Sequence, residues 1–273
     1  MNMDWSKTKS IFIGVFLILN LFLYSQYVNT YNGAKNLELL GKSNDIEARL
    51  KEENITYDAL TESIETPPYI SAKVKKYSLD ELPANSNQDY RLINDHKLVV
   101  EFKDPIKLIS TKQEATLNDF LRQYVYEGQS FELWEIDEEA QTATFFQRFN
   151  DRVLYYNENA EVKVYWNENG EVSRYEQSML ENIEEIEHDE PILPPLQILQ
   201  TLYAKNLLKP DSHITTVELG YSTLIRVTKT QVFSPTWKVR VQVADGEEEQ
   251  YFVNAIEGKV VDLTQDIQEV EEE

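Results

Sequence analysis

The hydrophobic and polar positions divide the chain sharply near its N-terminus. Residues 10–28, SIFIGVFLILNLFLYSQYV, contain no charged residue, and the first charge after Lys9 is Lys35. A helix that crosses the hydrocarbon core of a bilayer needs about 20 mostly apolar residues. Within lipid, a helix also satisfies its own backbone hydrogen bonds. The pattern therefore predicts a transmembrane helix over residues 10–28.

The flanks of this run predict its orientation. Lys7 and Lys9 precede it, and basic residues beside a span favour the cytoplasmic side. We therefore expect a cytoplasmic N-terminus and an extracellular domain. A cleavable signal peptide is the alternative, but the segment Tyr24-Ser-Gln-Tyr27 lacks the small-x-small cleavage pattern. A retained anchor in the cell membrane agrees better with the sequence.

Beyond the anchor, the periodicity alternates between helix and strand. Apolar residues at helical spacing predict helices over 45–53, 116–125 and 195–207, with Thr116 as a cap. Period-two alternation predicts strands over 69–79, 97–102, 130–136, 140–149, 152–156, 162–166, 171–176, 214–219, 221–229, 236–244, 250–254 and 259–263. Residues 82–88 are interpreted as a loop, and residues 181–190 as an acidic link. Short Asn- and Gly-containing turns between the strands favour antiparallel hairpins.

The predicted fold class is α+β: a single N-terminal transmembrane helix, then an ectodomain of antiparallel sheets with flanking helices. The hairpins at Val162–Val172 and Gln250–Val260 echo each other and suggest two related units. The expected order is a cytoplasmic N-terminus (1–9), the transmembrane helix (10–28), a stalk (29–43), a first α+β unit (44–180), a second unit (181–268) and an acidic tail (269–273).

Composition limits what the domain binds and how it is held together. The formal net charge is −22 over 273 residues, which disfavours a nucleic-acid partner. The chain has no cysteine, which excludes disulfides, thiol catalysis and cysteine-ligated metals. An extracellular domain without disulfides depends on its apolar core for stability, and 41% hydrophobic residues suffice for one.

No catalytic, metal or cofactor motif emerges. The histidines, at positions 96, 188 and 213, lack the spacing of a zinc site, and phosphate-binding glycine loops and serine-nucleophile motifs are absent. We therefore predict no catalytic residue, no metal and no cofactor. The aromatic residues from Phe145 to Tyr156 can line a ligand groove, although core packing is the commoner role for such residues.

One polar residue lies in the middle of the predicted anchor. Asn20 shares a helical face with Phe16, Leu17, Leu23 and Tyr24. An amide within hydrocarbon gains from a hydrogen bond to another helix. These five residues are the predicted partner-binding face; an Asn that bonds only its own backbone is the alternative.

Both ends of the chain resemble a known family. The opening Met3-Asp-Trp-Ser-Lys-Thr-Lys-Ser-Ile-Phe-Ile, followed by Phe16-Leu-Ile-Leu-Asn20, is similar to the start of YycI proteins. The segments Pro235-Thr-Trp-Lys-Val-Arg-Val and Tyr251-Phe-Val-Asn-Ala-Ile-Glu-Gly-Lys-Val resemble the C-terminal region of that family. The middle of the chain matches in length and character.

The resemblance implies a non-enzymatic regulator in a Gram-positive bacterium. YycI proteins act with a YycH-like protein on the sensor histidine kinase YycG (WalK), which governs cell-wall metabolism through a two-component system. Whether the kinase is activated or inhibited is left open, as are the signal and the contact surface. The alternatives are a membrane-tethered cell-wall hydrolase with a carboxylate pair and an extracellular peptide- or sugar-binding module.

Overall fold

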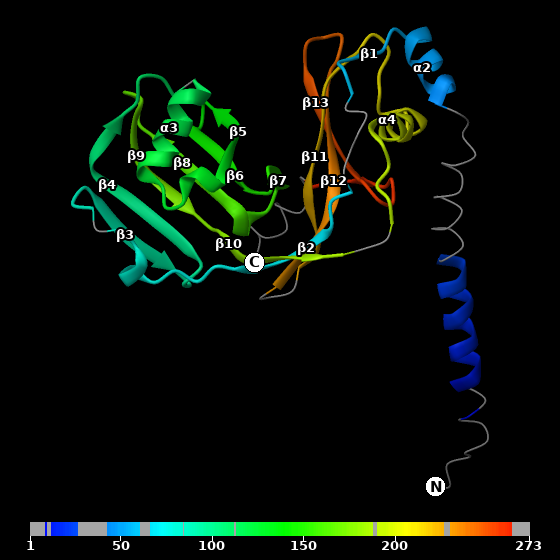
Figure 1. The fold of residues 1–273 in the computed structure, drawn as a ribbon, viewed down its shortest axis with the longest axis horizontal. Coiled ribbons are helices and arrows are strands. Elements are labelled where there is room, and N and C mark those ends of the chain that lie inside the picture. Colours follow the sequence, from blue (N-terminus) through cyan, green and yellow to red (C-terminus); the bar gives the residue numbers. More distant parts are fainter. Residues whose placement is uncertain are drawn as a thin grey trace.

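The structure is a computed structural model, which describes residues 9, 12–26, 43–60, 66–83, 85–111, 113–187, 190–226 and 230–263. After residue 43 the described chain is mostly strand (Figure 1). Its helices are α2 (Ser43–Glu52), α3 (Glu114–Tyr124) and α4 (Pro195–Ala204), and its 3-10 turns are η1 (Leu79–Glu81), η2 (Gly128–Ser130) and η3 (Glu158–Ala160). The predicted sheet-dominated α+β class is confirmed.

The strands form two groups, which we call the α3 sheet and the α4 sheet after the helices that cover them. The α3 sheet is antiparallel throughout, in the order β5-β6-β8-β9-β4-β3. Its strands are β3 (Gln88–Ile93), β4 (Lys97–Lys107), β5 (Phe131–Asp137), β6 (Thr142–Phe149), β8 (Glu161–Trp166) and β9 (Glu171–Gln177).

The α4 sheet contains segments from both ends of the described domain. β10, β2, β12 and β11 lie side by side in that order, and β13 pairs with β12 and with β14. The strands are β1 (Thr56–Tyr57), β2 (Tyr69–Val74), β10 (Leu180–Ile186), β11 (His213–Arg226), β12 (Thr230–Gln242), β13 (Glu248–Asn254) and β14 (Val260–Val261). Pairing is antiparallel except where β1 runs parallel to β11.

A short strand joins the two sheets. β7 (Arg152–Tyr155) pairs antiparallel with the end of β6 and parallel with the middle of β11. The hydrogen-bonded path is therefore continuous from β10 at one end to β3 at the other.

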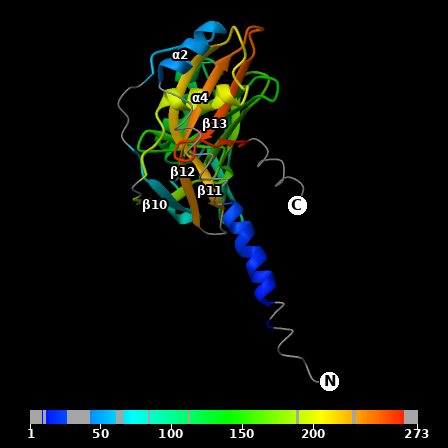
Figure 2. The ribbon, with the colours of Figure 1, turned by 90° about the vertical axis from the view of Figure 1, so that its right-hand side faces the viewer.

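Each sheet packs its helices over a separate core. α3 presents Leu117, Phe120 and Leu121 to the inner face of its sheet, at the spacing that the sequence predicted. On the other sheet, Ile46 and Leu50 of α2 pack with Leu199 and neighbouring residues of α4. Figure 2 shows α2 and α4 together over the strands of the α4 sheet. The core under α2 and α4 contains residues from both sides of the boundary expected between residues 180 and 181. The division of the domain into two related units remains a prediction.

The hairpins expected at the turns 167–170 and 257–258 are confirmed, and they share one arrangement of hydrogen bonds. The Asn167 Oδ1 accepts the backbone N–H groups of Asn169 and Glu171, each at 3.0 Å. The Asn254 Oδ1 likewise accepts from residues 256 and 257, at 3.0 and 2.8 Å. A glycine with positive φ follows in each turn, Gly170 at 73° and Gly258 at 65°. The turn at 157–159 was expected to join two hairpin strands, but β7 pairs with β6 and β11, and not with β8.

Several local predictions were wrong. Residues 181–190 were interpreted as an acidic link, but Leu180–Ile186 forms β10 and pairs with β2. The strand was hidden by its three glutamates; Glu184 and Glu185 are exposed and Glu181 is half-buried, while Leu180 is buried. α3 begins at Glu114 with Gln113 as its N-cap, rather than with a Thr116 cap. The sequence also did not predict the edge strands β1 and β3.

Other strands are longer than the pattern indicated. β4 continues through Pro105, where its pairing with β9 shifts register between Glu101 and Ile106, and a proline fits at such an irregularity. β11 is one strand across Gly220, although two were expected. β12 begins at Thr230 instead of Thr236. Pairing with strands that are distant in the sequence extends β4 past Pro105 and β11 past Gly220, although proline and glycine normally interrupt a strand.

Candidate interaction sites

The predicted partner-binding face lies on a helix over residues 12–26, separate from the sheets (Figure 1). The Asn20 side chain is exposed, as are the four predicted neighbours, with exposed fractions from 53% at Leu23 to 66% at Phe16 and Tyr24. Residues three and four positions apart share a helix face, so these five side chains form one surface.

The extent of this helix bears on the predicted span. Of residues 10–28, the ends at 10–11 and 27–28 lie outside the described residues. Within the part of the chain that the structure describes, no helix has both the length and the apolar character of a membrane span.

The second site is an aromatic cluster where the two sheets meet, which we call the junction. The Trp134 ring lies at centroid distances of 5.2 Å from Tyr156, 5.3 Å from Phe146, 5.7 Å from Tyr155 and 6.3 Å from Phe252. These rings come from β5, β6, β13 and the end of β7. Offset and edge-on ring pairs at such distances are favourable beyond the area that they bury.

A buried ammonium group lies beneath this cluster. The Lys238 Nζ is 5.0 Å from the Trp134 ring centroid and 2.7 Å from Glu218 Oε2. The Lys238 side chain is 6% exposed, whereas that of Glu218 is 57% exposed. Burial, followed by the nearby Glu218 carboxylate, raises the pKa of Tyr155 well above its ordinary value, so this phenol stays neutral. A second cation lies at the same ring, because the Arg240 guanidinium carbon is 5.9 Å from the Trp134 centroid and its Nε is 3.7 Å from Glu248 Oε1. The junction is thus a packed aromatic interface with two cations, each beside a carboxylate.

Buried amides add hydrogen bonds between the sheets. The Gln147 side chain donates to Leu180 O at 3.0 Å and accepts from Leu180 N at 2.8 Å. The Asn157 Nδ2 donates to Thr223 Oγ1 at 2.8 Å and to Gln231 Oε1 at 2.6 Å. A buried amide group without a hydrogen-bond partner destabilises the folded state, so these bonds favour one relative position of the two sheets.

The aromatic residues predicted as a possible groove are divided among three clusters. Phe145 is in the core of the α3 sheet, and Phe149 packs beside Leu154. Phe146, Tyr155 and Tyr156 are in the junction. The core role is therefore confirmed for Phe145, and these side chains do not form a single groove.

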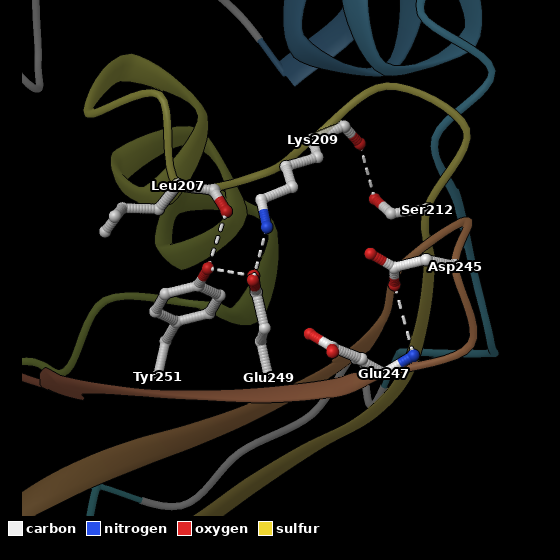
Figure 3. Close-up of polar contacts among 7 residues, drawn as sticks. All are labelled: Leu207, Lys209, Ser212, Asp245, Glu247, Glu249 and Tyr251. Carbon is white, nitrogen blue, oxygen red and sulfur yellow. Dashed lines mark hydrogen bonds and ion pairs between the residues drawn. The ribbon is translucent and has the colours of Figure 1, made fainter.

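A polar cluster fixes the loop after α4 to β13 (Figure 3). The Tyr251 hydroxyl oxygen lies 2.8 Å from Leu207 O and 2.5 Å from Glu249 Oε2, so its single proton is shared between two acceptors, while Lys209 Nζ donates to Glu249 Oε1 at 2.5 Å. The bonds from Lys209 and then Tyr251 lower the pKa of Glu249. Nearby, Asp245 Oδ1 accepts from the Glu247 backbone. Each polar atom of the Tyr251–Glu249–Lys209 chain has a protein partner, so the cluster ties this loop to the sheet.

A hydroxyl–imidazole–carboxylate chain links β1 to β11, and no motif in the sequence predicted it. Thr56 Oγ1 lies 2.8 Å from His213 Nδ1, and His213 Nε2 lies 3.4 Å from Asp58 Oδ1. The order resembles that of a catalytic triad. Thr56 and Asp58 are exposed and His213 is half-buried, however, and Thr56 and His213 are register partners of the two paired strands. The geometry thus favours a structural link. In the described part of the chain, no cluster of three or more His, Asp or Glu is placed to hold a metal ion.

Comparison with solved structures gives weak overall likeness. An uncharacterised protein from Eubacterium rectale matches with 11% identity and a TM-score of 0.43, over 77% of this chain and 91% of its own. YycH from Bacillus subtilis matches with 11% identity and a TM-score of 0.36, over 77% of this chain and 52% of its own. A search of curated proteins found no match.

The chain matches the model of a protein family. The model described as YycI protein matches residues 34–256, which cover most of the domain beyond the N-terminal helix. This range includes α2, α3, α4, the junction rings and all the strands of both sheets except β14. The chain belongs to the YycI family.

Proposed function

We propose that this chain is a membrane-anchored, non-enzymatic regulator of the sensor histidine kinase YycG (WalK) of a two-component system that controls cell-wall metabolism. Membership of the YycI family over residues 34–256 is the observation that carries the proposal. In this proposal the protein acts together with a YycH-like protein. It spans the cell membrane once, with a cytoplasmic N-terminus and an extracellular domain, on the sequence grounds of Lys7, Lys9 and the uncharged run.

The proposed mechanism is a shift between kinase conformations. A regulator changes such an equilibrium only by its differential affinity for the two states, and about 1.4 kcal/mol changes it tenfold. Helix contacts within a bilayer are of this size, because packing and interhelical hydrogen bonds decide association there. The exposed face with Asn20 and its neighbours Phe16, Leu17, Leu23 and Tyr24 supports this part of the proposal.

The test exchanges the anchor while the domain is kept. Residues 10–28 are replaced by an unrelated apolar helix of the same length, and the full chain is purified from membranes with its bound proteins. Transcription that depends on the kinase is measured in the same strains. We expect the YycH-like protein and the kinase to copurify with the natural chain, and both association and output to fall with the exchanged helix.

Two outcomes would contradict the proposal in different ways. If neither protein copurifies with the natural chain, the regulatory assignment itself is wrong. If the exchanged helix keeps full association and output, the anchor is only a tether and the contacts are made by the extracellular domain.

A further inference from the structure

The strand β3 forms one end of the α3 sheet and pairs only with β4 among the described strands. The Lys103 N–H donates to Asn87 O at 3.0 Å, which makes residues 87 and 103 a hydrogen-bonded pair of this ladder. Bonded and non-bonded pairs alternate along an antiparallel ladder. The backbone N–H and C=O groups of Tyr90 and Leu92 therefore point away from β4, and no partner for them is found among the described residues.

This edge lacks the features that usually block another strand. β3 has six residues, contains no proline and keeps a constant register with β4. Natural edges are commonly protected by bulges, prolines or charges. Only charges are present here: the exposed Asp89 and Arg91, which have opposite signs and point to the same face of the sheet.

The charges around β3 differ from those of the chain as a whole. Residues 88–103 contain three basic side chains, Arg91, Lys97 and Lys103, and three acidic ones, Asp89, Asp95 and Glu101, so their formal charges cancel, whereas the whole chain has a net charge of −22. Two copies of this acidic protein can therefore approach here with less repulsion than elsewhere.

Asp89 is also incompletely compensated within its own chain. It lies directly opposite Glu101 in the ladder, and like charges in that position are unfavourable. The Lys103 Nζ lies 3.2 Å from Asp89 Oδ1, whereas the Arg91 guanidinium lies 3.7 Å from Glu101 Oε1. A further cation beside Asp89 would reduce this repulsion.

We propose that β3 pairs antiparallel with β3 of a second copy of this chain, about a two-fold axis at Tyr90. In this register Tyr90 exchanges both backbone hydrogen bonds with Tyr90 of the second copy. Asp89 of each chain then faces Arg91 of the other, so two complementary pairs form across the axis. This interaction goes beyond the proposed regulation of the kinase and rests only on the membrane anchor of that proposal.

The same charges argue against other occupants and registers. A uniformly basic strand would be repelled by Arg91, and a uniformly acidic strand would be repelled by Asp89. A shift of the axis to residue 91 would place Arg91 opposite Arg91 of the second copy. The interface is small, so we expect it to form mainly where chains share a membrane, since tethering raises the effective concentration.

Cysteine crosslinking in membranes tests the register, because the natural chain has no cysteine. Two differently tagged full-length chains, one Asp89→Cys and one Arg91→Cys, are expressed together and oxidised. Directly opposite residues lie within disulfide range, whereas residues displaced by two positions do not. We expect a mixed 89–91 disulfide and little crosslinking when Asp89→Cys is expressed alone. Arg122→Cys on α3 is the exposed control.

A charge exchange tests the attraction itself. Arg91→Asp should weaken self-association of the full chain in detergent about tenfold, because two attractive pairs become repulsive. The double variant Asp89→Arg/Arg91→Asp should restore much of it, and Arg122→Asp should leave it unchanged. Thermal unfolding of each variant reports whether the fold is intact. Absence of the 89–91 disulfide, crosslinking of this edge to a different protein, or failure of the double variant to recover association would each overturn the proposal.

Discussion

The ring of Tyr155 lies directly against the backbone of Gly220. A Cβ at position 220 would be 2.5 Å from Tyr155 Cε2 and 2.6 Å from its hydroxyl oxygen. Tyr155 is fully buried and cannot swing aside without disturbing the junction. This contact explains why a glycine occurs within the long strand β11, where glycine is otherwise unfavourable.

Gly220→Ala should therefore destabilise the fold by about 1–3 kcal/mol, the usual cost of overpacking. Urea unfolding of the purified protein measures the change. Combining the substitution with Tyr155→Leu makes a double-mutant cycle. We expect the double variant to lose less than the sum of the single changes. Full additivity would mean that the two residues do not clash.

The ion pair beneath Trp134 should respond asymmetrically to mutation. Glu218→Gln leaves the buried Lys238 ammonium without its carboxylate and should cost about 1–3 kcal/mol. Lys238→Met removes the buried charge, leaves a well-hydrated Glu218 and should cost less. Denaturant unfolding of both variants at the same pH provides the comparison. An equal or larger loss for Lys238→Met would show that the cation–aromatic contacts outweigh the buried charge.

The Glu249 cluster predicts a component of acid sensitivity. Because its pKa is lowered in the folded protein, this carboxylate contributes stability above its unfolded pKa and loses it as pH falls through the folded value. Glu249→Gln should therefore be less stable than the natural protein at pH 7, and the difference should shrink below about pH 4.5, the ordinary value for glutamate. Unfolding measured across this range, with Glu247→Gln as the control, tests the sign. A difference that is constant with pH would contradict it.

Asn20 should matter for association more than for insertion. An interhelical hydrogen bond in lipid is worth roughly 0.6–2 kcal/mol, so Asn20→Leu should weaken association with the kinase or the YycH-like protein about threefold to thirtyfold. Crosslinking or two-hybrid assays in membranes measure this. The matched control, Asn20→Leu/Phe22→Asn, keeps an amide in the helix on another face. If this double variant associates as well as the natural chain, association depends on the presence of an amide anywhere in the helix and not on the predicted face.

The membrane topology can be tested at an exposed site. Ile109 lies in the loop after β4 and is 95% exposed, so Ile109→Cys should react with a membrane-impermeant maleimide in intact cells. Ser212 would be a poor choice, because it is 1% exposed and its hydroxyl donates to Lys209 O. Labelling that appears only after the membrane is broken would reverse the proposed orientation.

Local features of the sequence sufficed for much of the fold. Leu117, Phe120 and Leu121 face the core because helical spacing places them on one stripe, and Asn167 with Gly170 forms a turn because each has the required local chemistry. The family was also recognisable from short segments at both ends. These inferences depend on residues that are close together in the chain.

The tertiary structure decided what depends on distant pairing. β10 is a strand because β2 lies beside it, despite glutamates that suggested a link. Trp134, Lys238 and Phe252 meet because β7 connects two sheets whose strands come from separate parts of the chain. Local periodicity records which side of a strand is buried, but not which strand lies next to it. The junction and the free edge of β3 follow from that order of strands, so only the folded chain reveals them.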